Sequence, residues 1–329
     1  MQFRALRIHR QHDQTVARYQ TMRVDELTAG EVLVRVQYSS INYKDALAAT
    51  AAGKILRRYP LNGGIDLAGV VEHSDDARYV AGQSVLVTGC GLSETLDGGY
   101  AELARVPASA VIALPQGLDA IDAMTLGTAG FTAALAIHRM EHNGLAPGQG
   151  EIVVTGASGG VGSIAIDMLT TRGYAVTAMT GRAQQRDYLQ ALGAQTVLLR
   201  QELAMDAAPL TTARFAGAID SVGGECLSWL IRSLSFNASV ASVGLIAGSE
   251  LHVSLMPFLL RGVNVLGVNS AATPRELREH IWQRIATDLK PRHLPQLRTR
   301  VIEFDDLLRA FPDYLNNQVH GRTVVRIQH

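Results

Sequence analysis

This chain has few cysteines and a formal net charge of zero. Two cysteines, Cys90 and Cys226, stand far apart among 329 residues, which is too few for a disulfide framework and predicts a reducing, cytoplasmic compartment. Thirty basic side chains balance 30 acidic ones, so we expect no nucleic-acid partner and no anionic-membrane partner. We find no apolar run of membrane-spanning length and no signal-peptide core after Met1, and therefore expect no membrane association.

Metal-ligand patterns are also scarce. A catalytic zinc site needs about three converging Cys, His or carboxylate ligands, and a structural site needs about four cysteines. The ten histidines show no paired metal spacing. We interpret His138 and His142, four residues apart on an expected helix, as surface or capping residues. The sequence therefore predicts a zinc-free protein.

The most informative segment is a glycine-rich turn near the middle of the chain. The β-branched run 152–155 ends in Gly156-Ala157-Ser158-Gly159-Gly160-Val161-Gly162, after which the apolar spacing becomes helical. A strand, a tight turn and a helix N-terminus gather unpaired backbone N–H groups and the positive end of a helix dipole. Gly156 permits the turn, and Gly162 lets the helix pack closely on the strand. The residues expected to line a pyrophosphate are Ser158, Gly159, Gly160 and Val161.

The next strand ends in residues that suit a phosphorylated ribose. The run 174–179 is followed by Thr180-Gly181-Arg182, at the position where a dinucleotide fold reads the adenosine ribose. An acidic residue there would repel a 2′-phosphate, whereas the Arg182 guanidinium can bind one through two hydrogen bonds. Arg200, after the strand 195–199, is a second candidate partner. The sequence therefore predicts NADPH as the cofactor.

The remaining pattern predicts an α/β protein with two domains. The first third is rich in alternating strands, such as 31–38 and 84–88, and 329 residues exceed one comfortable core. Short apolar strands alternating with helices then indicate a doubly wound parallel sheet of Rossmann type. Its six expected strands are Ile152–Thr155, Ala175–Met179, Thr196–Leu199, Ala216–Asp220, Ser239–Gly244 and Val263–Val268. A helix at 274–289 follows. The expected segments are 1–122 (catalytic), 123–270 (cofactor-binding) and 271–329 (returning to the catalytic domain).

Short-chain dehydrogenases carry a similar glycine motif, but at the start of the chain and with a Tyr followed by Lys four residues later. No Tyr of this sequence has a Lys at that spacing. Several other segments, which follow one another in a characteristic order along the chain, resemble a different family. These are Ser40-Ile41-Asn42-Tyr43-Lys44-Asp45, Gly64-Ile65-Asp66-Leu67-Ala68-Gly69, Gly127-Thr128-Ala129-Gly130-Phe131-Thr132-Ala133, Asp220-Ser221-Val222-Gly223-Gly224, Pro257-Phe258-Leu259-Leu260-Arg261-Gly262-Val263 and Asn316-Asn317-Gln318.

Over nearly its whole length the chain resembles the zinc-free quinone oxidoreductase branch of the medium-chain dehydrogenase/reductases. Most specifically, it resembles the NADPH-dependent acryloyl-CoA reductase subfamily. Two positions depart from the family pattern. Gly63 stands where the family usually has Pro, and Leu96-Asp97 stand where it commonly has His-Trp. The resemblance implies a β-rich GroES-like catalytic domain, a Rossmann domain and a homodimer.

The resemblance also implies hydride transfer from NADPH to an activated C=C bond, with a short 2-enoyl-CoA such as acryloyl-CoA as substrate. It places Asn42 and Tyr43 at the nicotinamide as the candidate catalytic residues, with Tyr43 as either a proton donor or a packing residue. Lys44 and Asp45 are interpreted as an ion pair or as helix-start residues. Residues expected to border the cofactor from later strand ends and the tail are Ser221, Leu245, Asn269 and Asn317.

A CoA substrate carries phosphates, so cations are expected at the mouth of the site. Lys54, Arg57 and Arg58 form the densest nearby group; the other interpretation is a solvated charged turn. Two further functions stay open. One is an NADPH:quinone reductase, and the other is a non-catalytic NADPH-binding regulator.

Overall fold

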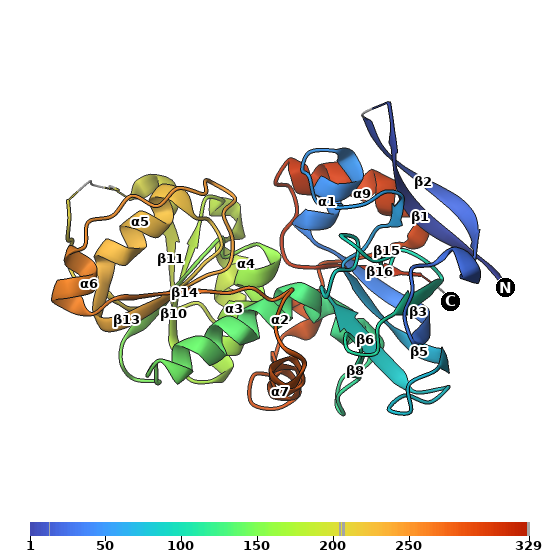
Figure 1. Ribbon diagram of the computed structural model, residues 1–329. Helices are drawn as coiled ribbons and strands as arrows, with labels where there is room; N and C mark the ends of the chain where they lie inside the picture. The colour runs from blue at the N-terminus through green and yellow to red at the C-terminus, as the bar shows by residue number, and fades with distance from the viewer. Residues whose placement is uncertain (13, 204, 206–207, 328–329) are drawn as a thin grey trace. The chain divides into compact units, whose positions relative to one another are not determined.

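The computed structural model describes residues 1–12, 14–203, 205 and 208–327 (Figure 1). The chain divides into two compact units. Unit 1 comprises Met1–Thr128, Ala271–His280 and Arg298–His329, and unit 2 comprises Ala129–Ser270 and Ile281–Leu297. The nucleotide-type unit is therefore inserted into the chain of the β-rich unit.

Unit 2 is built on a six-stranded sheet in the order β11-β10-β9-β12-β13-β14, in which every ladder is parallel. The order reverses at β9, so the crevice at the carboxyl ends of β9 and β12 is the place where such sheets bind ligands. The prediction of a doubly wound six-stranded parallel sheet is confirmed. The strands are β9 (Glu151–Thr155), β10 (Ala175–Thr180), β11 (Thr196–Leu199), β12 (Phe215–Asp220), β13 (Leu234–Ser242) and β14 (Asn264–Gly267).

Helices connect these strands. They are α3 (Gly160–Thr171), α4 (Arg186–Ala191), α5 (Gly224–Ser233) and α6 (Met256–Arg261), with short 3-10 turns at Ala183–Gln185 and Arg200–Glu202. The buried face of α5 joins β12 and β13 in one apolar cluster that includes Phe215, Trp229 and Leu230. Strand β13 begins at Leu234 rather than at the expected Ser239. The pairing shifts between Phe215↔Leu234 and Gly217↔Ser239, and this bulge hides the first half of the strand from an alternating pattern.

Unit 1 contains a seven-stranded sheet in the order β15-β16-β3-β5-β6-β8, with β7 also paired to β3, and a three-stranded sheet β2-β1-β4. Its helices α1 (Tyr43–Thr50) and α9 (Leu307–Leu315) lie side by side (Figure 1). The strands are β1 (Gln2–Gln11), β2 (Gln14–Arg23), β3 (Val32–Ile41), β4 (Leu61–Asn62), β5 (Asp66–Ser74), β6 (Ser84–Thr88), β7 (Leu103–Val106), β8 (Ile112–Ala113), β15 (Arg300–Glu303) and β16 (Thr323–Arg326); 3-10 turns occupy Val24–Glu26 and Phe304–Asp306.

Helix α2 (Ala120–His142) contradicts the expectation that no segment has the length and composition of a membrane span. Its 23 residues reach a mean hydropathy of 1.4 over the most apolar window. Yet 78% of that window is buried inside the protein, as in a core helix that packs on all sides. The helix is also broken at Gly127, whose φ of 51° and ψ of −152° are not helical.

The returning segment expected at 271–329 is divided between the units, because Ile281–Leu297 packs with unit 2. Helix α7 (Arg275–Ala286) begins in unit 1 and continues into unit 2. There Trp282 stacks on Phe131 with ring centroids 6.3 Å apart. The buried Asp167 carboxylate accepts the backbone N–H of His293 at 2.9 Å, just before α8 (Leu294–Leu297).

The turn between β9 and α3 requires its glycines. Gly156 has a φ of 58°, in the left-handed region that favours glycine. A Cβ at Gly162 would lie 2.5 Å from the Gly156 carbonyl oxygen and 2.8 Å from Ala157 Cα. The backbone leaves no space for a side chain there, so α3 approaches the end of β9 as closely as glycine permits.

Candidate functional site

The first part of the site is the glycine turn of unit 2. Gly159 donates its N–H to the Gly156 carbonyl at 2.9 Å, and α3 begins at the next residue. The first backbone N–H groups of α3 have no partner within the helix, as at any helix N-terminus. With Ser158, Gly160 and Val161, this turn presents N–H groups and the positive end of a 12-residue helix to one point.

The second part gathers the groups predicted to bind the ribose phosphate. Arg182 Nη2 donates to Ser158 Oγ at 2.8 Å, and the Arg182 N–H donates to Thr180 Oγ1 at 3.1 Å. The Arg200 guanidinium lies against Gly181, with Nη2 3.6 Å from the position of a Cβ on that glycine. Burial lowers the pKa of Arg182, and a nearby anion would offset this loss of hydration. Two guanidinium groups and two hydroxyls thus meet at the carboxyl ends of β9, β10 and β11.

The third part lies at the end of β12. Asp220 is fully buried and accepts hydrogen bonds from Thr155 Oγ1 at 2.6 Å and from the Gly223 N–H at 2.8 Å. Burial raises the pKa of Asp220. These bonds fix the turn that carries Ser221, whose buried Oγ has no hydrogen-bond partner among the described residues. A buried hydroxyl without a partner is costly, and a bound ligand can satisfy it.

The remaining predicted residues of unit 2 lie at the same edge of the sheet. Leu245 follows β13 with 64% of its surface exposed, and its Cα borders Gly223. Asn269 follows β14 and is also exposed. The carboxyl ends of β9 to β14 therefore carry all of the cofactor residues predicted in this unit.

In unit 1, the predicted Asn42 and Tyr43 stand at the start of α1. The Asn42 N–H donates to Asp45 Oδ2 at 2.8 Å, so Asp45 holds the first turn of the helix, as a helix-start residue does. Lys44 forms an ion pair with Glu94 instead of Asp45. Tyr43 leaves 40% of its surface exposed, so its phenol is within reach of a ligand.

Both ends of the Asn42 amide are engaged within unit 1. Its Nδ2 donates to Asp66 Oδ2 at 2.8 Å and to Asp45 Oδ2 at 3.2 Å. Its Oδ1 accepts from Arg322 Nη1 at 3.2 Å. An amide with two donors and both in use has none left for a substrate oxygen. Asn42 is therefore arranged to position the start of α1.

Asp66 is the centre of this network. Its fully buried carboxylate accepts from Ser40 Oγ at 2.6 Å and from Thr128 Oγ1 at 2.5 Å. The Thr128 N–H also donates to it, at 3.0 Å. The broken helix α2 resumes at Thr128, so Asp66 satisfies the first donor of its second half.

The buried Arg322 completes the network. Its guanidinium donates to Ser40 Oγ at 2.8 Å and to the Thr125 carbonyl at 2.9 Å, and its Nη2 lies 4.0 Å from Asp66 Oδ2. A Cβ at Gly127 would lie 2.6 Å from Asp66 Oδ2 and 3.1 Å from Arg322 Nη2, so the absence of a side chain at this position leaves room for the two charges. Asn317, on the tail after α9, is exposed and has a φ of 59°.

The sequence analysis missed Asp66 and Arg322 as functional residues. Each is a single charged residue in an otherwise apolar strand or strand end, and a charge at such a position is rarely buried without a partner. That pattern was the available signal. Their pairing could not be read from it, because Arg322 stands far along the chain from Asp66.

The basic residues Lys54, Arg57 and Arg58 lie on an exposed segment of unit 1 without helix or strand. The Arg57 N–H donates to the Glu94 carbonyl at 2.8 Å, which ties the segment to the loop that pairs with Lys44. No ion pair joins the three side chains to any carboxylate in the described part of the chain. Their charges are thus available to a ligand.

The two departures from the family pattern lie in the scaffold of unit 1. Asp97 is fully buried and accepts from the backbone N–H groups of Thr28 and Asn62, each at 2.8 Å, and from Arg7 Nη1 at 3.1 Å. A Cβ at Gly63 would lie 3.0 Å from the Tyr100 ring. These residues hold strands together.

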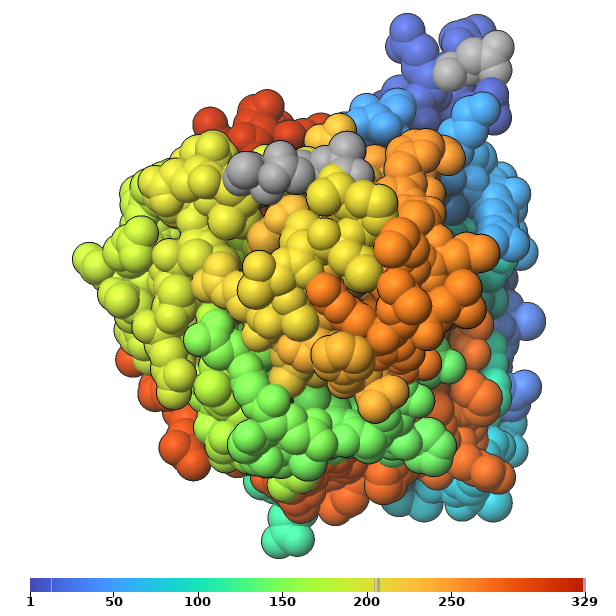
Figure 2. Space-filling model, turned by 90° about the vertical axis from the view of Figure 1, so that its left-hand side faces the viewer, coloured from blue at the N-terminus to red at the C-terminus, as the bar shows by residue number. Residues whose placement is uncertain are grey.

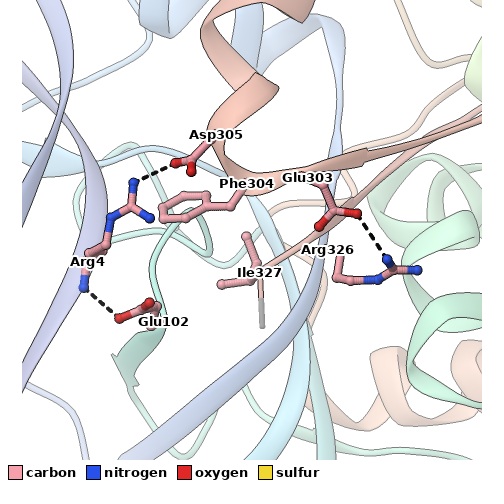
Figure 3. Close-up of a pocket in the computed structure, with 7 residues that line it drawn as sticks. All are labelled: Arg4, Glu102, Glu303, Phe304, Asp305, Arg326 and Ile327. Atoms are coloured by element: carbon pink, nitrogen blue, oxygen red, sulfur yellow. Dashed lines mark hydrogen bonds and ion pairs between the residues drawn. The ribbon is translucent and has the colours of Figure 1, made fainter. Parts of the chain in front are cut away.

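A pocket of about 420 Å³ lies elsewhere in unit 1, where β1 meets β15 and β16 (Figure 3). Its charged rim is internally paired: Arg4 with Asp305 at 2.5 Å and Arg326 with Glu303 at 3.0 Å. The Arg4 N–H donates to Glu102 at 2.8 Å, over an apolar floor that includes Phe304. None of the predicted site residues lines it.

No group of three or more His, Cys, Asp and Glu side chains suited to a metal ion occurs within residues 1–12, 14–203, 205 and 208–327. His138 and His142 stack on each other with centroids 6.5 Å apart. His138 Nδ1 also lies 3.4 Å from Arg284 Nη1.

Comparison with known proteins agrees with both units. Residues 28–116 match the family model "Alcohol dehydrogenase GroES-like domain", and residues 160–287 match "Zinc-binding dehydrogenase". The chain is 46% identical over 323 residues to "Probable acrylyl-CoA reductase AcuI" of Escherichia coli (strain K12), covering 98% of this chain and 99% of that one. It is 42% identical over 326 residues to "Putative quinone oxidoreductase YhfP" of Bacillus subtilis (strain 168), covering 99% of both.

A solved structure is similar throughout. The yhdH oxidoreductase from Salmonella enterica, in complex with NADP, superimposes with a TM-score of 0.95 at 45% identity, covering 99% of this chain and 100% of that one. Together, the inserted parallel sheet and the GroES-like unit define a two-unit oxidoreductase. The chain belongs to the medium-chain dehydrogenase/reductase superfamily, in its quinone oxidoreductase and acryloyl-CoA reductase branch.

The buried carboxylates generate a pH prediction. Burial and then the nearby Asp66 raise the pKa of Asp45 from 3.8 to about 7, so ionising Asp45 opposes folding. The contribution of Asp45 to the free energy of unfolding should therefore fall as the pH rises from about 4 to about 7. Above pH 7 this contribution should stay constant. Asp45→Asn should abolish that fall, measured by urea unfolding across the pH range.

The control for this experiment is Asp167→Asn, which also removes a fully buried carboxylate. It reports the general cost of losing such a group. A pH dependence in Asp45→Asn equal to that of the wild type would contradict the assignment.

Proposed function

We propose that the chain is an NADPH-dependent reductase of the activated C=C bond of a short 2-enoyl-CoA, with acryloyl-CoA as the expected substrate. The observation that carries the proposal is the meeting of Arg182, Arg200, Ser158 and Thr180 at the carboxyl ends of three neighbouring strands. Two guanidinium groups suit a ribose 2′-phosphate. The relative that is 46% identical and named an acrylyl-CoA reductase supports the substrate.

The residues present fit this cofactor. The glycine turn offers backbone N–H groups to a pyrophosphate, and Ser221 Oγ is a buried hydroxyl that lacks a protein partner. Gly159, Gly160, Val161, Leu245 and Asn269 would border the bound molecule. When bound, NADPH supplies the hydride for the reduction. Metal chemistry is not part of the proposal, and the zinc-free expectation stays a prediction.

The residues of unit 1 would complete the chemistry. Reduction of an enoyl thioester places negative charge on the thioester oxygen and requires a proton at the α-carbon. Asn42 acts as a positioning residue, since its amide is held by Asp66, Asp45 and Arg322. That leaves Tyr43 as the exposed polar group at the start of α1. Its phenol either donates a proton or packs the cofactor in place, and Asn317 of the tail is proposed as a further cofactor contact.

The exposed Lys54, Arg57 and Arg58 would bind the phosphates of CoA, and this gives the test of the substrate. Purified protein should oxidise NADPH in steady state with acryloyl-CoA, against a panel of other enoyl-CoA thioesters and quinones. Replacing both Arg57 and Arg58 by Glu should raise KM for acryloyl-CoA roughly tenfold or more, about 1.4 kcal/mol per factor of ten, because two attractions become repulsions. KM for a quinone should stay unchanged.

Arg309→Glu is the control for a charge reversal elsewhere on unit 1, since the Arg309 side chain is 87% exposed on helix α9. Turnover of quinones alone would favour the second candidate, an NADPH:quinone reductase, as the name of the 42% identical relative suggests. Binding of NADPH without oxidation by either substrate class would favour a non-catalytic regulator.

Arg182 tests the cofactor assignment independently of the substrate. Arg182→Glu should weaken NADPH binding at least tenfold more than NADH binding, because the new carboxylate repels only the 2′-phosphate. Fluorescence titration of both nucleotides measures the two Kd values. Arg186→Glu, four residues further on, controls for the local change of charge. Equal losses for the two nucleotides would refute the assignment.

Tyr43→Phe separates the two roles left open for this residue. If the phenol delivers a proton, kcat should fall while Kd for NADPH changes little, since the ring remains. An unchanged kcat assigns Tyr43 to packing. Stopped-flow measurement of NADPH oxidation under single-turnover conditions keeps product release out of the comparison.

We further propose a homodimer formed through unit 2, and a cytoplasmic location in keeping with two free cysteines. Strand β14 is the outer strand of its sheet, and edge strands can pair with a second copy. Large apolar side chains are exposed shortly before β14 in the chain: Leu255, directly before α6, and Leu259 and Leu260 of α6, at 70%, 77% and 57%. Figure 2 shows the side of unit 2 that carries α6, in orange. Exposed apolar groups of this kind mark interaction surfaces.

The dimer is tested by sedimentation of purified protein. The wild type should have twice the mass of the chain, and Leu259→Glu should shift it toward the monomer. Val80→Glu is the control, because Val80 is a comparably exposed apolar residue of unit 1, at 64%. A monomeric wild type at micromolar concentration would exclude the proposal.

A further inference from the structure

The pocket shown in Figure 3 is a feature of unit 1 that the proposed reaction does not use. Its volume of about 420 Å³ falls in the range of about 300–1,000 Å³ that is typical of small-molecule sites. Segments from the start, the middle and the end of the chain line it. They supply Arg4 of β1, Glu102 directly before β7, Glu303 of β15, Phe304 and Asp305 of the following 3-10 turn, Arg326 of β16 and Ile327.

Hydrogen bonds of the backbone fix the walls of this pocket. The Glu102 N–H donates to the Arg4 carbonyl at 3.0 Å, and the Arg4 N–H donates to Glu102 Oε2 at 2.8 Å. Glu303 and Arg326 stand directly opposite each other in the ladder that joins β15 and β16. Both walls belong to unit 1, so the pocket is formed by a single folded unit.

The pocket is separate from the residues expected to meet the substrate. Arg326 is the last residue of β16, and Arg322, which belongs to the Asp66 network, stands directly before the first. At about 3.3 Å per residue, four residues of strand place the two Cα atoms about 13 Å apart. A ligand in the pocket is therefore bound outside the proposed active site.

The charges that line the pocket do not cancel. Three carboxylates, those of Glu102, Glu303 and Asp305, stand against two guanidinium groups, those of Arg4 and Arg326. Both ion pairs of the rim are partly exposed to solvent, and such pairs contribute little to stability. A carboxylate of the rim can therefore accept a second cation at small cost. The excess negative charge in a concave site attracts cations rather than anions.

The floor of the pocket is apolar, and its aromatic ring already contacts a planar cation. Phe304 and Ile327 belong to a buried apolar cluster of unit 1, and Figure 3 shows them between the Arg4 and Glu303 side chains. Arg4 Cζ lies 5.6 Å from the centroid of the Phe304 ring, within the range of a cation–π contact. Its Nη2 donates to Asp305 Oδ1 at 2.5 Å. A ring beside carboxylates is a combination that recognises a planar organic cation.

We propose that this pocket binds a small organic cation with a planar guanidinium or amidinium head and an apolar body. The head meets the carboxylates of Glu303 and Glu102, which match its parallel N–H groups. The body covers Phe304 and Ile327. The site stands independently of the proposed reductase activity, because it shares no residue with the expected cofactor and substrate contacts.

The test is a titration with benzamidine at low ionic strength, followed by NMR of isotope-labelled isoleucine methyl groups. The Ile327 δ1-methyl signal, identified by its loss in Ile327→Val, should shift in a saturable way. The signal of Ile137, which is fully buried in unit 2, should not shift. Benzamide has nearly the same shape and no charge, so it should bind roughly tenfold more weakly.

Two substitutions within one ion pair should act in opposite directions. Glu303→Gln removes a carboxylate and should raise the Kd for benzamidine roughly fivefold, whereas Arg326→Met removes a repelling charge and should lower the Kd. Glu276→Gln, at an exposed position of α7 in unit 1, should leave the Kd unchanged. Damage to packing alone would weaken binding in both pair variants.

Three outcomes would overturn the proposal: no saturable shift of the Ile327 signal, equal affinity for benzamide, or a change of Kd in the same direction in both pair variants. The side chains of Glu303 and Arg326 are 47% and 35% exposed, so both variants should fold. If either does not, Glu102→Gln decides. A Kd raised severalfold then supports the site, and an unchanged Kd refutes it.

Discussion

The buried Asp66 carboxylate is the interaction on which unit 1 depends. It joins β3 through Ser40, the start of α1 through Asn42, and the resumed half of α2 through Thr128. Arg322 balances its charge from the far end of the chain. Removing one partner of a buried pair leaves the other uncompensated, at a cost of about 3–5 kcal/mol. The position of Tyr43 is therefore set by a charge pair that need never touch a substrate.

Unit 2 uses a different constraint, which is space. Glycines at 156 and 162 let α3 approach the end of β9, so that backbone N–H groups point to one place. Side-chain chemistry is then added at strand ends: Arg182 after β10 and Ser221 after β12. The glycine turn is therefore the part that any dinucleotide-binding fold requires, and the side chains at the strand ends are the part that selects NADPH. The turn binds a pyrophosphate of either nucleotide, and the guanidinium groups favour the phosphorylated one.

The sequence was most informative where structure is local. The six strands of unit 2 were predictable because short apolar runs end at glycines or polar residues, and only the bulged start of β13 escaped. Ser158 and Arg182 could each be assigned to the end of one of two successive strands, but the hydrogen bond between them was not predicted. The buried network could not be predicted, because Asp66, Thr128 and Arg322 meet only in the folded chain. The need for glycine at position 127 was likewise hidden, because it comes from the space that those charged groups occupy.

The difference between buried residues that hold the fold and exposed residues that can meet a ligand also bears on substrate choice. Asp97 departs from the family pattern, but its carboxylate is buried and bound by the N–H groups of Thr28 and Asn62 and by Arg7. The Asp97 carboxylate thus joins segments of unit 1 and is not accessible to a ligand. Asn42 is likewise engaged at both ends of its amide. Among the predicted site residues of unit 1, the exposed ones are Tyr43, Asn317 and the three basic residues Lys54, Arg57 and Arg58. Buried residues such as Asp97 can affect substrate choice only through the positions they give to the exposed ones.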